Sequence, residues 1–258
     1  MRLHVARIIA NSEIRSGVHL LEVYAPQLAE AVQPGQYCMV RCCPPLASDP
    51  LLRRPFFVHT VQRAQGLCTF LVYVQGRGTA WLAQQAAEGV LDILGPMGHG
   101  WQLRPTTKNL LLINEGSLLQ SVTLLAQIAV EQERAVTLVG HYLSAEEVYP
   151  PALLAPEIEY HIVTQERSLG ERGDIESVLG NYLTWADAAY CSVSQQTVLD
   201  LYTKFERLRL KHFAQGLWLR PFVCGNGVCL TCRVETVVGP KLLCRDGPVF
   251  DLRTIARS

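Results

Sequence analysis

The sequence lacks the features that mark several large classes of protein. No apolar stretch approaches the roughly 18–20 residues that a membrane-crossing helix needs, because Gln, Asn or Glu interrupts each candidate. Neither sign of charge is in excess, since Lys and Arg together number 23 and Asp and Glu together number 23. This balance argues against a protein that holds nucleic acid on a basic surface. No G-x-S-x-G, H-E-x-x-H or Walker-type motif is present, so we expect no catalytic nucleophile.

The chain has 258 residues, of which 49% are hydrophobic and 18% charged, so it can bury a core. Its length predicts two domains and a small third module. The first residues, MRLHVARIIANSE, hold too short an apolar run for a secretory leader, and we expect a cytoplasmic protein. In that compartment cysteines stay reduced, so clustered cysteines among the nine indicate a metal or redox site rather than disulfides.

Short alternating or apolar runs fill the chain up to about residue 100. They are HVARII, HLLEVYA, QYCMVRC, PFFVHTVQ, CTFLVYV and VLDILG, separated by turns rich in Pro, Gly or polar residues. This pattern predicts an antiparallel β-barrel over residues 1–102. One helix is expected over residues 79–89, with Thr79 as its N-cap and Gly89 as its stop.

After residue 102 the pattern becomes an alternation of buried-type strands and helices. Strands are expected at Leu110–Ile113 and in AVTLVGHY, EYHIVTQE and DAAYCSV, and helices at about 118–133, 175–182 and 199–214. Alternating strands and helices predict a parallel, Rossmann-like α/β domain over residues 103–215. The remaining residues, 216–258, are too few for a core of their own, so a metal centre is expected to hold them together.

Four cysteines in this last segment form the strongest pattern. Cys224, Cys229 and Cys232 have the spacing C-x4-C-x2-C, and Cys244 follows after eleven further residues. Three thiolates in one loop with a distant fourth can enclose a [2Fe–2S] cluster, and Gly225 and Gly227 between them can take positive φ values that turn N–H groups toward sulfur. The alternative is a zinc site, which usually contains two short-spaced cysteine pairs. The other five cysteines are interpreted as small buried hydrophobic residues, namely Cys38, Cys42, Cys43, Cys68 and Cys191.

Three weaker patterns are typical of a flavin site. Arg53–Phe57 reads RRPFF after a Pro-rich loop, so an arginine fork can meet a pyrophosphate at the start of a strand. Gly76–Thr79 reads GRGT where a strand meets a helix, and a phosphate can approach the backbone there. Gly95–Trp101 reads GPMGHGW, which has more glycine than a simple linker needs.

With these motifs the chain resembles the flavin and iron–sulfur electron-transfer subunit of bacterial two-protein dihydroorotate dehydrogenase, within the ferredoxin–NADP reductase superfamily. The resemblance covers nearly the whole length and includes Asp246–Phe250, which reads DGPVF after the fourth cysteine. It implies an FAD barrel and a [2Fe–2S] cluster on the four cysteines. Two residues depart from the family pattern, since Phe57 replaces a serine and Tyr73 replaces an arginine. The implied flavin contacts are Arg54, Pro55, Phe56, Phe57, Leu71, Val72, Tyr73, Gly78 and Thr79.

The nicotinamide-binding turns of that superfamily are altered in this chain. The glycine-rich turn after the first strand of the second domain reads NEGSLLQ over residues 114–120, and a later Cys-Gly-Pro turn reads Cys191-Ser192-Val193. Glu115 would put a negative charge near the phosphates, at a cost of about 4 kcal/mol for two like charges about 4 Å apart at an effective dielectric constant near 20. We therefore expect no direct oxidation of NADH or NADPH. The alternative is that both loops have rearranged and still bind a nucleotide.

These observations lead to a predicted function with one alternative. A flavin exchanges two electrons and a [2Fe–2S] cluster exchanges one, so a chain that holds both converts between the two modes. We expect a subunit of a hetero-oligomer that relays electrons between FAD and a catalytic oxidoreductase subunit, such as a dihydroorotate dehydrogenase chain. The alternative is a non-catalytic structural or docking subunit with decayed cofactor sites and a metal-bound tail.

Overall fold

The computed structural model describes residues 1–166 and 168–255. They form two compact units, each assembled from separate stretches of the chain. Unit 1 comprises Met1–Gly100, Arg220–Arg233 and Leu242–Pro248, and unit 2 comprises the remaining described residues. The segment predicted as a third module, 216–258, is thus divided between the two units, and its last three residues lie outside the described part. All four clustered cysteines belong to unit 1.

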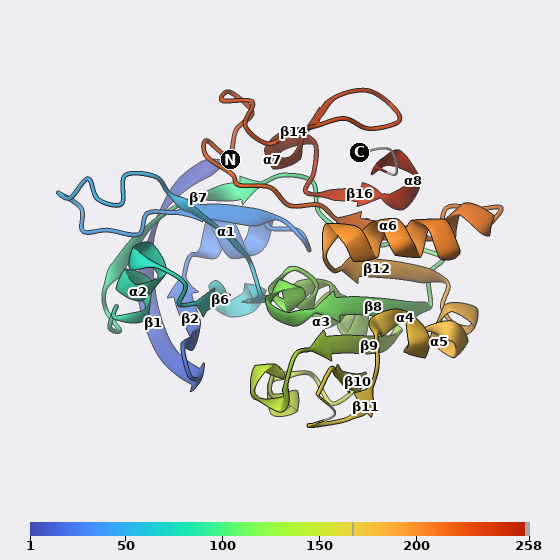
Figure 1. The fold of residues 1–258 in the computed structure, drawn as a ribbon. Coiled ribbons are helices and arrows are strands. Elements are labelled where there is room, and N and C mark those ends of the chain that lie inside the picture. Colours follow the sequence, from blue (N-terminus) through green and yellow to red (C-terminus); the bar gives the residue numbers. More distant parts are fainter. Residues whose placement is uncertain (167, 256–258) are drawn as a thin grey trace. The chain divides into compact units, whose positions relative to one another are not determined.

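Unit 1 is built on a seven-stranded antiparallel sheet in the order β4-β3-β7-β1-β2-β6-β5. The sheet curls, because β4 at one end of this order contacts β6 near the other end. This half-barrel confirms the predicted barrel class for the N-terminal region (Figure 1). The strands are β1 (Arg2–Arg15), β2 (Val18–Tyr24), β3 (Tyr37–Val40), β4 (Arg54–Phe57), β5 (Thr60–Gln62), β6 (Leu67–Tyr73) and β7 (Val90–Met97).

The helices of unit 1 are short, and one differs from the prediction. They are α1 (Pro26–Ala31), the 3₁₀ turn η1 (Arg63–Gln65), α2 (Arg77–Ala83) and α7 (Leu243–Asp246). The expected helix at 79–89 is wrong in both bounds, since α2 follows Gly76 and ends at Ala83. The Asn11 side chain of β1 explains the early end, because its amide group donates to the carbonyl oxygens of Leu82, Ala83 and Gln85 at 3.1, 3.1 and 2.7 Å.

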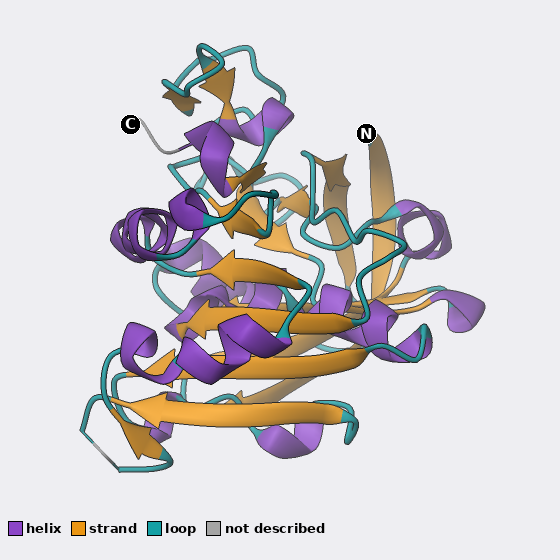
Figure 2. Ribbon diagram, turned by 90° about the vertical axis from the view of Figure 1, so that its right-hand side faces the viewer, coloured by secondary structure: helices purple, strands orange, loops and turns teal. Residues whose placement is uncertain are grey.

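Unit 2 contains a second seven-stranded sheet in the order β11-β10-β9-β8-β12-β13-β16. The strands from β11 to β13 are parallel, and β16 is antiparallel to β13. Figure 2 shows the long parallel strands as neighbouring arrows that point the same way. Leu110–Ile113 at the centre are fully buried, as expected for a parallel strand covered on both faces. The strands are β8 (Asn109–Glu115), β9 (Ala135–Tyr142), β10 (Ile158–Thr164), β11 (Glu171–Arg172), β12 (Ala188–Ser192), β13 (Ala214–Leu217) and β16 (Val249–Asp251).

Helices and 3₁₀ turns alternate with these strands, which confirms the predicted α/β class. The two longest are α3 and α6, and α6 runs beside β12 in Figure 1. Within the described residues, no helix is both long enough and apolar enough to cross a membrane. The set is η2 (Gly116–Ser121), α3 (Thr123–Glu131), η3 (Ala145–Glu147), η4 (Pro151–Leu153), α4 (Ile175–Val178), α5 (Gly180–Trp185), α6 (Gln195–Lys204), η5 (Glu206–Leu208) and α8 (Leu252–Ile255). A small two-stranded sheet pairs β14 (Arg233–Val234) with β15 (Lys241–Leu242).

The helix expected over 199–214 is wrong at its C-terminal half. The chain leaves the α-helix after Lys204 because the Glu206 side chain turns inward, where it is 1% exposed. Its carboxylate accepts hydrogen bonds from the N–H groups of Phe213 and Ala214, both at 3.1 Å, and pairs with Arg253 at 2.9 Å. These long-range contacts favour a turn into β13 over a longer helix. The helix expected at 118–133 is likewise divided into η2 and α3, and the one at 175–182 into α4 and α5.

Candidate functional site

The four clustered cysteines lie on two segments of unit 1. Cys224, Cys229 and Cys232 are in the loop between β13 and β14, and Cys244 is in α7. Cys232 and Cys244 are buried, whereas Cys229 is exposed. The backbone N–H of Leu243 donates to the carbonyl of Cys232 at 3.2 Å and thereby holds α7 against the end of the loop. One edge of the cysteine cluster therefore faces the surface and the other lies inside the unit.

Backbone N–H groups of the loop point at the cysteine sulfurs. Gly225 and Gly227 have φ values of +74° and +85°, as the sequence predicts. Burial raises the pKa of the Cys224 thiol, but hydrogen bonds from N–H groups that include that of Cys229 lower the pKa to about 6 overall. Burial and the nearby Cys232 sulfur raise the pKa of Cys244 to about 12. The loop thus already supplies donors that stabilise negative charge on sulfur.

Two backbone hydrogen bonds link the four cysteines. The N–H of Cys229 donates to the sulfur of Cys224 at 3.5 Å, and the N–H of Cys244 donates to the sulfur of Cys232 at 3.4 Å. A structural zinc ion needs four ligands around one centre, whereas a two-iron cluster distributes four thiolates over two irons. Three cysteines in one loop with a fourth on α7 fit a [2Fe–2S] cluster better than a structural zinc site, which usually contains two short-spaced cysteine pairs.

Tyr37 connects the curled sheet to the four clustered cysteines. We call the segment from Cys224 to Cys232, together with Cys244 of α7, the cysteine loop. It lies on β3, is fully buried, and faces Phe57 of β4 in the antiparallel register. Its hydroxyl lies 2.8 Å from the carbonyl oxygen of Cys244 and 3.0 Å from that of Gly225, so its proton is shared between these two acceptors. The ring of Phe222 packs on the Tyr37 ring with centroids 4.8 Å apart. The predicted flavin strand β4 and the cysteine loop are consequently separated by a single strand.

The glycine-rich segment after β7 meets the chain that follows Cys244. The His99 N–H donates to the carbonyl of Gly247 at 2.6 Å, and its Nδ1 lies 2.7 Å from the carbonyl oxygen of Arg245. Gly98 has φ of +75°, and a Cβ atom there would lie 2.6 Å from the Gly247 oxygen. Glycine is required at this position because the two backbones touch. The sequence shows the excess of glycine in this segment, but it does not show which segment the glycines contact.

The predicted flavin residues come from three elements of unit 1, and β6 contacts both of the others. The elements are β4, β6 and α2.

Arg53 and Arg54, at the start of β4, have different roles. Arg53 forms an ion pair with Asp92 at 2.8 Å and also donates to backbone carbonyl groups, so it is structural. Arg54 donates to the carbonyl of Leu52 at 2.8 Å and has no ion pair with any carboxylate that the structure describes. Its charge therefore remains suited to an anionic group such as a pyrophosphate.

Gly78 lies against Arg54. A Cβ atom at Gly78 would lie 3.8 Å from the Arg54 side chain and 3.0 Å from Cβ of Cys42, so the start of α2 is tightly packed there. The Thr79 hydroxyl accepts hydrogen bonds from the N–H groups of Gln75 and Gly76 at 2.9 and 3.1 Å. Thr79 is therefore inside α2 and not its N-cap, and its hydroxyl stabilises the turn itself.

The remaining predicted flavin residues are mostly inside the sheet. Phe56, Phe57, Leu71 and Val72 are buried, and Pro55 is exposed. Tyr73 is half-buried, and the Arg15 guanidinium lies 5.6 Å from the centre of its ring. Arg15 on β1 therefore places a positive charge beside the position where the family has arginine. Arg15 and Tyr37 were not predicted from the sequence. For Tyr37 the one available signal is a tyrosine within an apolar strand, because a buried hydroxyl needs a hydrogen-bond partner.

The two altered nicotinamide turns lie together at the carboxyl ends of β8 and β12 in unit 2. Asn114 and Ser192 are register partners, and both are fully buried. The Glu115 carboxylate contacts the start of α6, where it accepts a hydrogen bond from the N–H of Ser194 at 2.7 Å. Cys191 is buried in β12, and burial raises the pKa of its thiol.

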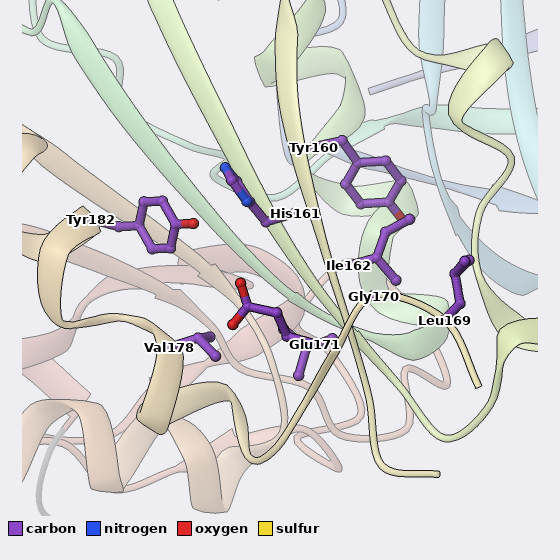
Figure 3. Close-up of a pocket in the computed structure, with 9 residues that line it drawn as sticks. Tyr160, His161, Ile162, Leu169, Gly170, Glu171, Val178 and Tyr182 are labelled. Carbon is purple, nitrogen blue, oxygen red and sulfur yellow. The ribbon is translucent and has the colours of Figure 1, made fainter. Parts of the chain in front are cut away.

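Unit 2 also contains a pocket of about 270 Å³ on β10, beneath α4 and α5. Figure 3 shows the His161, Glu171 and Tyr182 side chains around it. The rings of His161 and Tyr182 have centroids 4.8 Å apart. Burial and the negative charges of Glu171 and Glu159 raise the pKa of Tyr182. None of the predicted site residues lines this pocket.

A half-barrel sheet and a parallel α/β sheet, together with a four-cysteine loop, define a chain of ferredoxin reductase-like fold. Residues 220–256 match the family model for the iron-sulfur cluster binding domain of dihydroorotate dehydrogenase B. The electron transfer subunit of dihydroorotate dehydrogenase B (NAD(+)) from Geobacillus thermodenitrificans is 30% identical over 250 residues, with 94% of each chain covered. The corresponding subunit from Desulforamulus reducens is 27% identical over 255 residues, with 95% of each chain covered. The chain belongs to the family of dihydroorotate dehydrogenase B electron transfer subunits.

Solved structures agree with this fold. A chain from the structure of an NADH-dependent reduced ferredoxin-NADP oxidoreductase superposes with a TM-score of 0.83 at 19% identity, covering 97% of this chain and 89% of that one. A ferredoxin NADP+ reductase from Neisseria gonorrhoeae, solved with bound FAD and NADP, superposes with a TM-score of 0.61 at 16% identity. The superposition covers 79% of this chain and 90% of the reductase chain. At these identities the likeness concerns the fold.

Proposed function

We propose that this chain is an electron-transfer subunit that holds FAD and a [2Fe–2S] cluster and works with a separate catalytic oxidoreductase chain, of dihydroorotate dehydrogenase type, in the cytoplasm. When bound, FAD exchanges two electrons and the cluster exchanges one at a time. The observation that carries the proposal is the position of Tyr37. It is the register partner of Phe57 on the predicted flavin strand and also contacts the backbone of the cysteine loop.

The chain's own residues hold each group in place. Cys224 and Cys229 would ligate one iron, and Cys232 and Cys244 the other; a backbone N–H···S hydrogen bond within each of these pairs supports this division. Loop N–H groups that point at sulfur would stabilise the added negative charge of the reduced cluster. At the flavin site, Arg54 and the start of α2 would bind the pyrophosphate, and Arg15 would supply a second positive charge near Tyr73.

The exposed side of the cysteine loop is suited to docking the catalytic chain. Val228 and Leu230, on either side of Cys229, are 77% and 57% exposed. Exposed apolar side chains around a redox centre favour contact with a protein partner. The catalytic chain would therefore bind where Cys229 reaches the surface.

We further propose that neither NADH nor NADPH delivers electrons directly to this chain. The curated relatives carry NAD(+) in their names, whereas this chain has Glu115 and leucine side chains where a dinucleotide pyrophosphate needs a glycine-rich turn.

The test starts from protein purified without oxygen. Flavin near one per chain and iron near two per chain are expected. Zinc, or no metal, at the four thiols would contradict the electron-transfer proposal. Rapid mixing with NADH without oxygen should leave the flavin absorbance unchanged, and fast bleaching would show that this chain accepts electrons from NADH.

A further inference from the structure

Strands β8 and β12 are neighbours at the point where the order of the parallel sheet reverses. From β8 the chain continues to β9 and β10 on one side, and it then returns to β12 and β13 on the other side. Ligands of open parallel sheets bind at the carboxyl ends of the strands beside such a reversal. We call residues 114–121 and 192–197 the switch point. A dinucleotide bound by unit 2 would place its pyrophosphate here.

The Glu115 carboxylate occupies the N-terminus of α6 at the switch point. Its Oε2 accepts from the backbone N–H of Ser194, the N-cap residue, at 2.7 Å, and its Oε1 accepts from the Thr197 hydroxyl at 2.6 Å. The Ser194 hydroxyl in turn accepts from the N–H of Thr197 at 3.2 Å. A helix N-terminus stabilises an anion through its unpaired N–H groups and its dipole. At α6 the chain supplies that anion itself.

Two unpaired side-chain oxygens at the switch point are hydrogen-bond acceptors. The Asn114 side chain is fully buried, and its Oδ1 atom has no hydrogen-bond partner among the residues that the structure describes. The buried Oε1 of Gln120 also lacks a partner within residues 1–166 and 168–255. Phosphate oxygens are acceptors and need donors, so these two oxygens oppose a phosphate and do not bind it.

The segment that follows Glu115 is fixed to β12. The hydroxyl oxygens of Ser121 and Ser192 are 2.6 Å apart, and the Ser192 hydroxyl donates to the carbonyl of Leu118 at 2.7 Å. Ser121, Ser192 and Leu119 are fully buried. The chain therefore cannot open toward a nucleotide without breaking buried hydrogen bonds.

We infer that Glu115 is a specificity-determining residue that excludes the pyrophosphate of a nicotinamide dinucleotide from the N-terminus of α6. The inference deepens the proposed function and rests on its claim that NADH is not a direct donor. A dinucleotide would have to displace the carboxylate, which breaks its two hydrogen bonds, or place its phosphates beside it, where like charges repel.

The test is calorimetric titration of ADP-ribose, which carries the pyrophosphate without the nicotinamide, into the cofactor-loaded protein. Wild type should give no saturable binding. Glu115→Gln keeps the size of the side chain and removes its charge, and it should bind at least about tenfold more tightly. The matched control is Glu157→Gln, which removes an exposed carboxylate from the same unit and should behave as wild type. Glu115→Asp retains the charge and should also fail to bind.

Two outcomes distinguish a failure of this inference from a failure of the proposed function. If Glu115→Gln retains its flavin and iron but gains no affinity for ADP-ribose, the inference is overturned while the electron-transfer proposal stands. If wild type itself binds ADP-ribose as tightly as the variant, Glu115 excludes nothing, and the proposed exclusion of NADH falls with it. Should Glu115→Gln not fold, Glu115→Ala removes the same charge; it should also gain affinity, and an unchanged titration would refute the inference.

Discussion

The contact between Tyr37 and the cysteine loop can be removed by a single atom change. Tyr37→Phe deletes the hydroxyl that lies 2.8 Å from the Cys244 carbonyl oxygen and 3.0 Å from the Gly225 carbonyl oxygen. The aromatic ring remains, so its packing against Phe222 and Phe57 is retained. Any change in the variant therefore reports the hydrogen bonds between β3 and the loop.

The expected magnitude follows from burial. A hydrogen bond contributes about 1 kcal/mol net, and a buried acceptor left without its donor costs about 1–3 kcal/mol. Tyr37 is fully buried. We expect Tyr37→Phe to lower the free energy of unfolding of the holoprotein by about 2 kcal/mol, and to accelerate cluster loss by about tenfold or more, since about 1.4 kcal/mol corresponds to a factor of ten.

Urea unfolding and the decay of the cluster's visible absorbance in the presence of an iron chelator measure the two effects. The control is Tyr24→Phe, because Tyr24 is 43% exposed and stands on β2 of the same sheet. If Tyr37→Phe changes unfolding and cluster loss no more than Tyr24→Phe does, the Tyr37 hydroxyl does not hold the loop, and the reasoning is refuted.

Three further predictions concern the cluster, pH and the C-terminal end of unit 2. Cys229→Ser should reduce bound iron from about two to below one per chain, whereas Cys43→Ser should leave the iron content unchanged, and equal iron in both would contradict the ligand assignment. Burial lowers the pKa of His59 from 6.5 to about 3, so its neutral form is kept in the fold while the unfolded chain takes up a proton below pH 6.5. Its contribution to stability should fall by about 2 kcal/mol from pH 7 to pH 5, and urea unfolding of His59→Gln at both pH values should show a correspondingly weaker pH dependence; an unaltered dependence would exclude His59 as the cause. Glu206→Gln leaves the Arg253 charge without its partner and should cost about 3 kcal/mol of unfolding free energy in urea, while a loss below 1 kcal/mol would show that the pair is dispensable.

The cysteine loop was readable from the sequence because its chemistry is local. Three of the four predicted ligands lie within nine consecutive residues, and the glycines that turn the N–H groups toward sulfur lie between them. The two fold classes were readable for a similar reason, since strand and helix periods are properties of short windows. The ends of helices were not, as α2 shows, because the Asn11 side chain that closes it comes from a distant strand.

The sequence by itself determined the classes of the two sheets, the likeness to an electron-transfer family and the four thiols. Only the tertiary structure decided that Tyr37 connects the flavin strand to the cysteine loop, that Arg54 rather than Arg53 keeps its charge available, and that Glu115 is bound to the N-terminus of α6. These relations join residues far apart in the chain. Hydrogen bonding and close packing set them through distances of a few ångströms, and such distances are fixed only when the chain has folded.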